Sequence, residues 1–176
     1  IVSPLNGAVF QAPASVFVSA DFAASGCGVA GVGFYEGTLL LASDTTAPFS
    51  FTWNGVAAGT HTLTAVATDS NGNVTVSEPV SFRVNAAPSV SLTSPAAHAV
   101  FSAPANIPLS AAASDPDGQV VQVEFHANGG RVGTDTVAPF SLVWQNVPAG
   151  SYTLTAKATD NDGGVKTSAG VPITVQ

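Results

Sequence analysis

Two short loops rich in aspartate carry the residues best suited to chemistry in this chain. Asp115-Pro-Asp117-Gly118 and Asp160-Asn-Asp162-Gly163 each hold two carboxylates separated by one residue. Ca²⁺ takes about six to eight oxygen ligands, which clustered Asp side chains and backbone carbonyls supply. The sequence therefore predicts a calcium site with these carboxylate ligands: Asp115, Asp117, Asp160 and Asp162. The alternative is ordinary turn chemistry without a metal, because turns also favour Asp and Gly.

Exposed aromatic rings are a second candidate site, because sugar-binding sandwiches stack aromatic side chains on sugar rings. Phe17 lies between Val16 and Val18, and Tyr35 follows Phe34. Successive side chains of a strand point to opposite faces of the sheet. We expect Val16, Val18 and Phe34 to point into the core, so Phe17 and Tyr35 should point outward. The two rings are expected on different strands and different sheets, so they do not form one platform. Carbohydrate binding through Phe17 and Tyr35 is the alternative function.

Catalysis is not expected. The chain has three His residues and one Cys, and it lacks the Gly-x-Ser-x-Gly and His-Glu-x-x-His motifs. Asp44 and Asp135 occupy equivalent positions of an internal repeat, each followed by Thr, as turn-capping residues would. A catalytic pair has no reason to recur in both copies. We therefore predict no enzyme and no required cofactor, and the single Cys27 excludes an intrachain disulfide.

The charge balance excludes two classes of partner. Only four of the 176 residues are Lys or Arg, against 11 Asp or Glu, which gives a formal net charge of −7. Binding to nucleic acid requires a basic surface that displaces counterions from phosphate, which four cationic residues do not supply. An anionic membrane surface would repel a protein with this net negative charge. No apolar run reaches the roughly 20 residues that span a bilayer. We expect a monomer that binds neither nucleic acid nor membrane.

The sequence repeats once, at a constant spacing and without a gap. Trp53 corresponds to Trp144, which sets the spacing at 91 residues (144 − 53), and the matches extend over almost the whole chain. A repeat of this length is a whole domain rather than a solenoid unit. We predict domains at 1–86 and 87–176, joined by a short connector that Pro88 stiffens.

Apolar alternation predicts about seven strands in each copy and no stable helix. In the repeated segment, Leu63, Ala65 and Ala67 share one face, which is typical of a half-buried strand. The strands expected in the first copy cover 1–3, 15–22, 29–36, 39–42, 49–53, 60–69 and 74–84. Regularly spaced short strands separated by turns favour an all-β, immunoglobulin-like sandwich.

Tyr152 stands at the start of the sixth strand of the second copy. This is the place of a tyrosine corner, in which the hydroxyl bonds to the backbone a few residues upstream. His61 holds the matching place in the first copy. We therefore interpret His61 as a structural residue rather than a ligand or a base.

Several runs of the second copy carry a family resemblance. They are Ser94-Pro-Ala-Ala-His-Ala-Val-Phe, Ser114-Asp-Pro-Asp-Gly, Val123-Glu-Phe-His-Ala-Asn and Tyr152-Thr-Leu-Thr-Ala-Lys-Ala-Thr-Asp-Asn-Asp-Gly. Together they resemble the bacterial immunoglobulin-like domain, and the resemblance extends to the first copy. Such domains recur in tandem in secreted chitinases, other polysaccharide-degrading enzymes and surface adhesins. The resemblance implies an extracellular or cell-surface, non-catalytic module.

We therefore predict a non-catalytic accessory or spacer module of a secreted or surface-displayed bacterial multidomain protein. Its partners would be the adjacent domains of the same polypeptide, and the second domain offers an optional calcium site besides the turn interpretation of the same aspartates. The alternative is a binding module for a polysaccharide or a cell-surface glycan.

Overall fold

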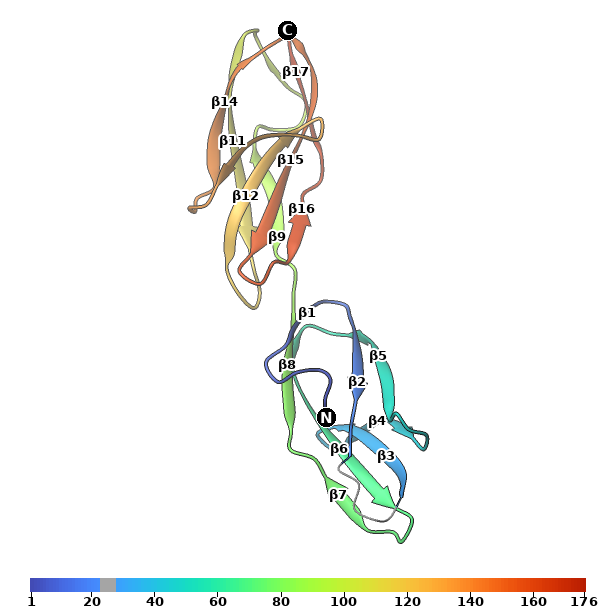
Figure 1. Ribbon diagram of the computed structural model, residues 1–176. Helices are drawn as coiled ribbons and strands as arrows, with labels where there is room; N and C mark the ends of the chain where they lie inside the picture. The colour runs from blue at the N-terminus through green and yellow to red at the C-terminus, as the bar shows by residue number, and fades with distance from the viewer. Residues whose placement is uncertain (23–27) are drawn as a thin grey trace. The chain divides into compact units, whose positions relative to one another are not determined.

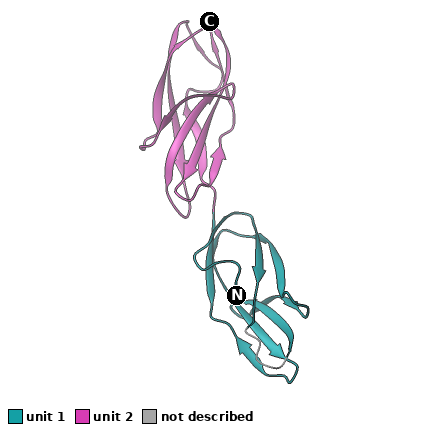
Figure 2. Ribbon diagram, viewed as in Figure 1, with its two compact units in different colours: residues 1–85 teal, residues 86–176 magenta. Residues whose placement is uncertain are grey.

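The computed structural model describes residues 1–22 and 28–176, and in these ranges it contains strands, turns and loops without any helix (Figure 1). Accordingly, none of the described residues forms a helix that could cross a membrane. The chain divides into two compact units, Ile1–Asn85 and Ala86–Gln176 (Figure 2). The sequence predicts this boundary one residue later. Cys27 lies outside the described residues.

Unit 1 is a sandwich of two unequal sheets. The larger sheet has the order β1-β8-β6-β3-β4, with β7 also paired to β6, and the smaller sheet joins β2 to β5. The strands are β1 (Val9–Gln11), β2 (Ala14–Ser19), β3 (Val29–Glu36), β4 (Leu39–Asp44), β5 (Ser50–Val56), β6 (Gly59–Asp69), β7 (Val74–Val76) and β8 (Val80–Asn85). An isolated bridge from Ser3 to Ser19 extends the smaller sheet.

Unit 2 repeats this plan. Its larger sheet has the order β10-β17-β15-β12-β13, with β16 paired to β15, and its smaller sheet has the order β14-β11-β9. The strands are β9 (Ser89–Ser94), β10 (Ala99–Phe101), β11 (Ala105–Ser114), β12 (Val120–Ala127), β13 (Gly130–Asp135), β14 (Ser141–Val147), β15 (Gly150–Asp160), β16 (Val165–Thr167) and β17 (Val171–Val175). The prediction of two tandem immunoglobulin-like sandwiches is confirmed.

The prediction of one continuous last strand is wrong. Residues 74–84 form two strands, β7 and β8, because Ser77 interrupts the pairing with β6. The Ser77 hydroxyl accepts a hydrogen bond from the Ala65 amide at 2.9 Å and donates one to the Glu78 carbonyl. A side chain thus takes the place of a backbone carbonyl in the ladder. Ser168 does the same at Ala156 in unit 2.

Each unit also contains a strand that the sequence pattern misses. β1 pairs in parallel with β8, and β10 pairs in parallel with β17, where the sequence predicts a loop. Both strands have only three residues. That length is too short for alternation between apolar and polar residues to be recognised.

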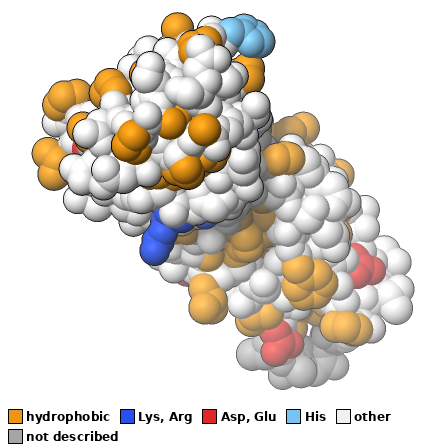
Figure 3. All heavy atoms as spheres, turned by 90° about the horizontal axis from the view of Figure 1, so that it is seen from above, with side chains coloured by type: hydrophobic (Ala, Val, Ile, Leu, Met, Phe, Trp, Pro, Cys, Tyr) orange, Lys and Arg blue, Asp and Glu red, His pale blue; other side chains and the backbone are white. Residues whose placement is uncertain are grey.

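The surface carries few charges. Figure 3 shows scattered hydrophobic side chains and only occasional acidic and basic ones on the face in view, in keeping with a composition that is 9% charged. Single exposed hydrophobic residues of this kind are normal on the surface of a folded protein. The face in view therefore shows no basic stripe.

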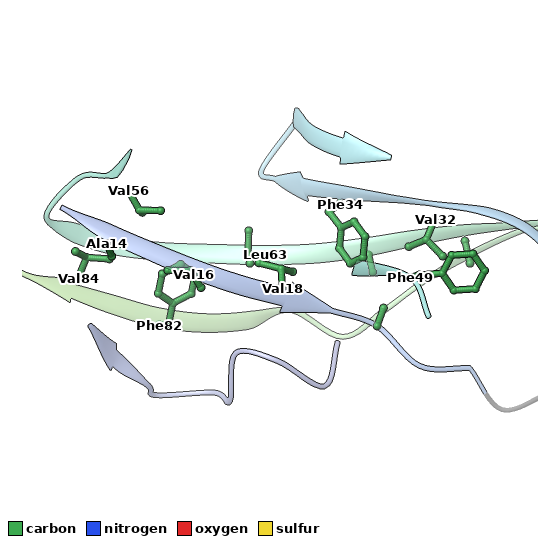
Figure 4. Packing of buried hydrophobic residues seen from close by; sticks show 13 residues of the cluster. Ala14, Val16, Val18, Val32, Phe34, Phe49, Val56, Leu63, Phe82 and Val84 are labelled. Carbon is green, nitrogen blue, oxygen red and sulfur yellow. The ribbon is translucent and has the colours of Figure 1, made fainter. Parts of the chain in front are cut away.

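The core of each unit lies between its two sheets. In unit 1, Val16 and Val18 of β2 face Phe34, Leu63 and Phe82 of the larger sheet, and all five are almost fully buried (Figure 4). The corresponding side chains of unit 2 are Ile107, Leu109, Phe125, Leu154 and Ile173, also buried. The alternation read from the sequence is therefore confirmed. The two tryptophans pack against these cores and stay partly exposed.

Candidate functional site

The two aspartate-rich loops of unit 2 lie together. One loop connects β11 to β12 and the other connects β15 to β16. The Asn161 amide donates to the Gln119 carbonyl at 3.0 Å, and the Gln119 amide donates to Asn161 Oδ1 at 2.6 Å. The proximity of these loops agrees with the sequence prediction, but the sequence analysis missed Asn161 as the residue that joins them.

Gly118 allows this close contact. A Cβ atom at this position would lie 2.6 Å from Asp115 Oδ2 and would overlap Asn161 Oδ1. Any other residue would therefore separate the loops or displace one of the two side chains. The sequence signals a turn here, but it does not reveal that the absence of a side chain brings the second loop close.

Asp115 is the least stabilised charge in this cluster. Both of its carboxylate oxygens are buried, and neither has a hydrogen-bond partner of good geometry. Burial raises the pKa of Asp115, the nearby Asp117 amide offsets part of this, and the negative charges of Asp160 and Asp117 raise it further. A bound proton or a cation would relieve this unfavourable arrangement.

Asp160, by contrast, accepts hydrogen bonds from the backbone of the turn that follows it. It is 2% exposed, and its Oδ1 atom accepts from the amides of Asp162 and Gly164, both at 2.8 Å. Asp69 holds the matching place in unit 1 and accepts from the Asn71 and Asn73 amides at 2.8 and 2.9 Å. This pattern recurs in both units, so it belongs to the fold and supports the turn interpretation for Asp160.

The remaining two acidic residues also face neutral donors. The Asp117 carboxylate accepts from the Ala86 amide at 3.2 and 3.3 Å, at the start of unit 2, and Asp162 Oδ2 accepts from the Asn161 side-chain amide at 2.8 Å. Among residues 1–22 and 28–176, no three or more His, Cys, Asp or Glu side chains are grouped to hold a metal ion. The four carboxylates thus do not form a ready-made cation cage.

Phe17 and Tyr35 lie on different sheets, in agreement with the sequence prediction. Phe17 projects from β2 of the smaller sheet and is 55% exposed. Tyr35 lies on β3 of the larger sheet and is partly buried. The two rings therefore do not form a shared platform for one ligand.

Tyr35 lines a shallow groove on the outer face of the larger sheet of unit 1. The groove encloses about 330 Å³ between strands β3, β4 and β6. A Cβ atom on Gly33 would lie 2.8 Å from Tyr35 Cε2 and 3.4 Å from Leu40 Cδ1. The tyrosine ring thus lies across the sheet over Gly33 instead of projecting into solvent.

The histidine and tyrosine at the start of the sixth predicted strand are structural. The Tyr152 hydroxyl donates to the Pro148 carbonyl at 3.0 Å, which confirms the tyrosine corner. His61 Nε2 lies 3.0 Å from the carbonyl oxygen of Ala57, the residue that matches Pro148, and its Nδ1 lies 2.7 Å from Glu36 Oε1. Both ring nitrogens of His61 face oxygen atoms within the fold, so the histidine replaces the tyrosine as the corner residue.

Asp44 and Asp135 cap equivalent turns, in agreement with the sequence prediction. Asp44 accepts from the Thr46 and Ser50 amides, both at 3.0 Å, and Asp135 accepts from the corresponding amides at 3.0 and 2.8 Å. These backbone hydrogen bonds hold the pKa of both carboxyls below the usual range. A carboxylate used in this way serves a turn rather than a reaction.

The paired sheets, the corner residues and the repeated caps define two tandem immunoglobulin-like sandwiches. Comparison with sequence families gives the particular family. The chain belongs to the bacterial Ig domain family, whose profile matches residues 1–65 and 88–156. The resemblance noted from the sequence motifs is therefore confirmed.

Two solved structures place the chain among known folds. The fibronectin(III)-like modules of CbhA from Clostridium thermocellum are 33% identical, with a TM-score of 0.53 over 99% of this chain and 92% of that one. A marsupial T cell receptor has a TM-score of 0.62 over 97% of this chain and 71% of that one, but at 9% identity it shows the fold alone. No curated protein matches the sequence. Modules of this kind are generally non-catalytic and are typical of extracellular or surface proteins.

Proposed function

We propose that the chain is a non-catalytic accessory module of a secreted or surface-displayed bacterial protein that degrades polysaccharide or mediates adhesion. The observation that carries this proposal is the use of the acidic side chains. Asp44, Asp69, Asp135 and Asp160 each accept hydrogen bonds from the backbone of a turn. These four carboxylates hold the turns of the sandwiches in shape, which suits a part that supports and links its neighbours.

Deletion of this segment from the polypeptide that contains it tests the proposal. Activity or binding towards a soluble ligand should be unchanged, while activity towards an insoluble polymer or a cell surface should fall, because the neighbouring domains lose their spacing. Fractionation with an antibody against the chain should find it in the culture medium or at the cell surface. Loss of activity towards the soluble ligand, or a cytoplasmic location, would refute the proposal.

Calcium binding at the aspartate-rich end of unit 2 is the second part of the proposal. What supports it is the Asp115 carboxylate, whose two buried oxygens have no hydrogen-bond partner of good geometry and which lies close to Asp117 and Asp160. A divalent cation would offset the repulsion among these groups, and carboxylate oxygens are the ligands that Ca²⁺ prefers. The site would stabilise unit 2 rather than take part in a reaction.

Binding of a polysaccharide or cell-surface glycan is the alternative function. The groove beside Tyr35 favours it, because this groove places an aromatic ring against hydroxyl-bearing side chains.

A further inference from the structure

The outer face of the larger sheet differs between the two units. In unit 2, Glu124 of β12 lies on this face, with Oε1 3.3 Å from Arg131 Nη1 and Oε2 3.3 Å from Lys157 Nζ. His126 Nε2 lies 4.0 Å from the same carboxylate. Glu124, Arg131 and Lys157 thus place a charged cluster on this face, with His126 beside it. The Arg131 and Lys157 side chains are 64% and 40% exposed, so this face presents cations rather than an apolar surface to a neutral ligand.

In unit 1 the same positions are uncharged. At the constant spacing of the repeat, Gly33, Leu40 and Val66 stand where unit 2 has Glu124, Arg131 and Lys157. Because Gly33 has no side chain, β3 carries none at the position that Glu124 occupies in unit 2. The groove of about 330 Å³ lies there, beside Tyr35. Gly33, Leu40 and Val66, which differ between the two copies, all line this groove.

The lining of the groove combines an apolar wall with polar hydroxyls. Tyr35 and Leu40 lie over Gly33, and the hydroxyl-bearing residues at the groove are Ser43, Thr45 and Thr68. Within the described part of the chain, the Tyr35 hydroxyl has no hydrogen-bond partner. A sugar ring has an apolar face and a rim of hydroxyls, so both parts of the lining fit it.

The charge of the groove selects the class of glycan. Asp44 is the charged residue in its lining, and both of its carboxylate oxygens are held by the amides of Thr46 and Ser50. The groove thus offers no cation to pair with an acidic sugar. It is also open along the surface, so it suits an internal stretch of a polymer better than an enclosed small molecule.

We propose that this face of unit 1 binds a neutral polysaccharide, with the Tyr35 ring stacked on one sugar ring. Unit 2 does not bind it, because Glu124 and its cationic neighbours cover the equivalent surface. Glycan binding at Tyr35 rests on the alternative function given above. The accessory role is tested separately, by the deletion experiment.

Binding of the full chain to insoluble cellulose and chitin, and its retardation in gels that contain soluble neutral glycans, test this proposal. The parent chain should bind at least one of these polymers. Tyr35→Ala should weaken that binding roughly tenfold, as expected for loss of a stacked ring. Gly33→Ala should weaken it as well, since the added Cβ displaces the ring while the tyrosine is kept. Tyr35→Phe should retain most of the binding.

Phe17→Ala is the matched control, because it removes an exposed aromatic ring from the opposite sheet. It should leave binding unchanged, and thermal denaturation should confirm that every variant is folded. If a variant at position 35 fails to fold, Gly33→Glu, which introduces the residue of unit 2, gives the same comparison. Absence of binding to every neutral polymer, binding to acidic polymers only, or binding that survives both Tyr35→Ala and Gly33→Ala would overturn the proposal.

Discussion

Replacement of Asp160 by alanine should destabilise unit 2 by about 2–4 kcal/mol. The substitution removes the acceptor of two backbone amides, those of Asp162 and Gly164, each at 2.8 Å. Gly164 is buried, so its amide would lose its partner without gaining water, which costs about 1–3 kcal/mol. The Asp162 amide is only partly buried, and its loss adds about 0.5–1.5 kcal/mol.

Each unit contains one tryptophan, which makes the measurement specific. Urea denaturation of the whole chain with Trp53→Phe follows unit 2 through Trp144, and the reciprocal variant follows unit 1. Asp69→Ala is the matched control in unit 1. It removes the acceptor of the equivalent turn where water reaches the amides, so it should cost less.

Asp160→Asn separates hydrogen bonding from charge. The side-chain amide oxygen of Asn still accepts both backbone hydrogen bonds, so this variant should retain most of the stability. If Asp160→Asn costs as much as Asp160→Ala, or if Asp69→Ala costs more than Asp160→Ala, the turn interpretation of Asp160 is refuted.

Three further outcomes are expected in unit 2. Asp115→Asn should increase the free energy of unfolding at pH 7, because burial and the neighbouring carboxylates raise the pKa of Asp115 in the folded protein. The ionised Asp115 destabilises the folded protein only above the pKa that this carboxyl has in the unfolded chain. The stability gained by Asp115→Asn should therefore vanish when urea denaturation is measured near about pH 3. A gain that persists at that pH contradicts a raised pKa of Asp115. Calcium should raise the melting temperature reported by Trp144 and not that reported by Trp53, and should lose this effect in Asp115→Asn; equal shifts, or none, would exclude the site. Tyr152→Phe should cost about 1 kcal/mol through the lost hydrogen bond to Pro148, as measured by urea denaturation.

Most of the fold could be predicted from the sequence because each long strand buries every second residue. Leu63, Ala65 and Ala67 are all buried, as their alternation indicates. The breaks in the strands could not be predicted in this way. The interruption at Ser77 depends on a side-chain hydroxyl that bonds to the neighbouring strand, and a sequence pattern carries no information about such a bond.

The candidate sites were predictable only in outline. The topology of the sandwich brings the two aspartate-rich loops to one end, and this much follows from the order of the strands. The tie between Asn161 and Gln119 depends on the exact path of each loop. The groove beside Tyr35 depends on a missing side chain at Gly33, and its meaning becomes visible only when Glu124 is seen at the equivalent place in unit 2.

The parallel pairing of β10 with β17 has a mechanical consequence. β10 lies near the start of unit 2 and β17 at its end, so a pull on the two ends drives these strands along each other in opposite directions. The hydrogen bonds between them, including those that Gln176 makes with Phe101 and Ala103, are then loaded together in shear instead of opening one after another. β1 and β8 are paired in the same sense in unit 1. The geometry of this pairing therefore resists extension of each sandwich more than an antiparallel pair that opens one hydrogen bond at a time.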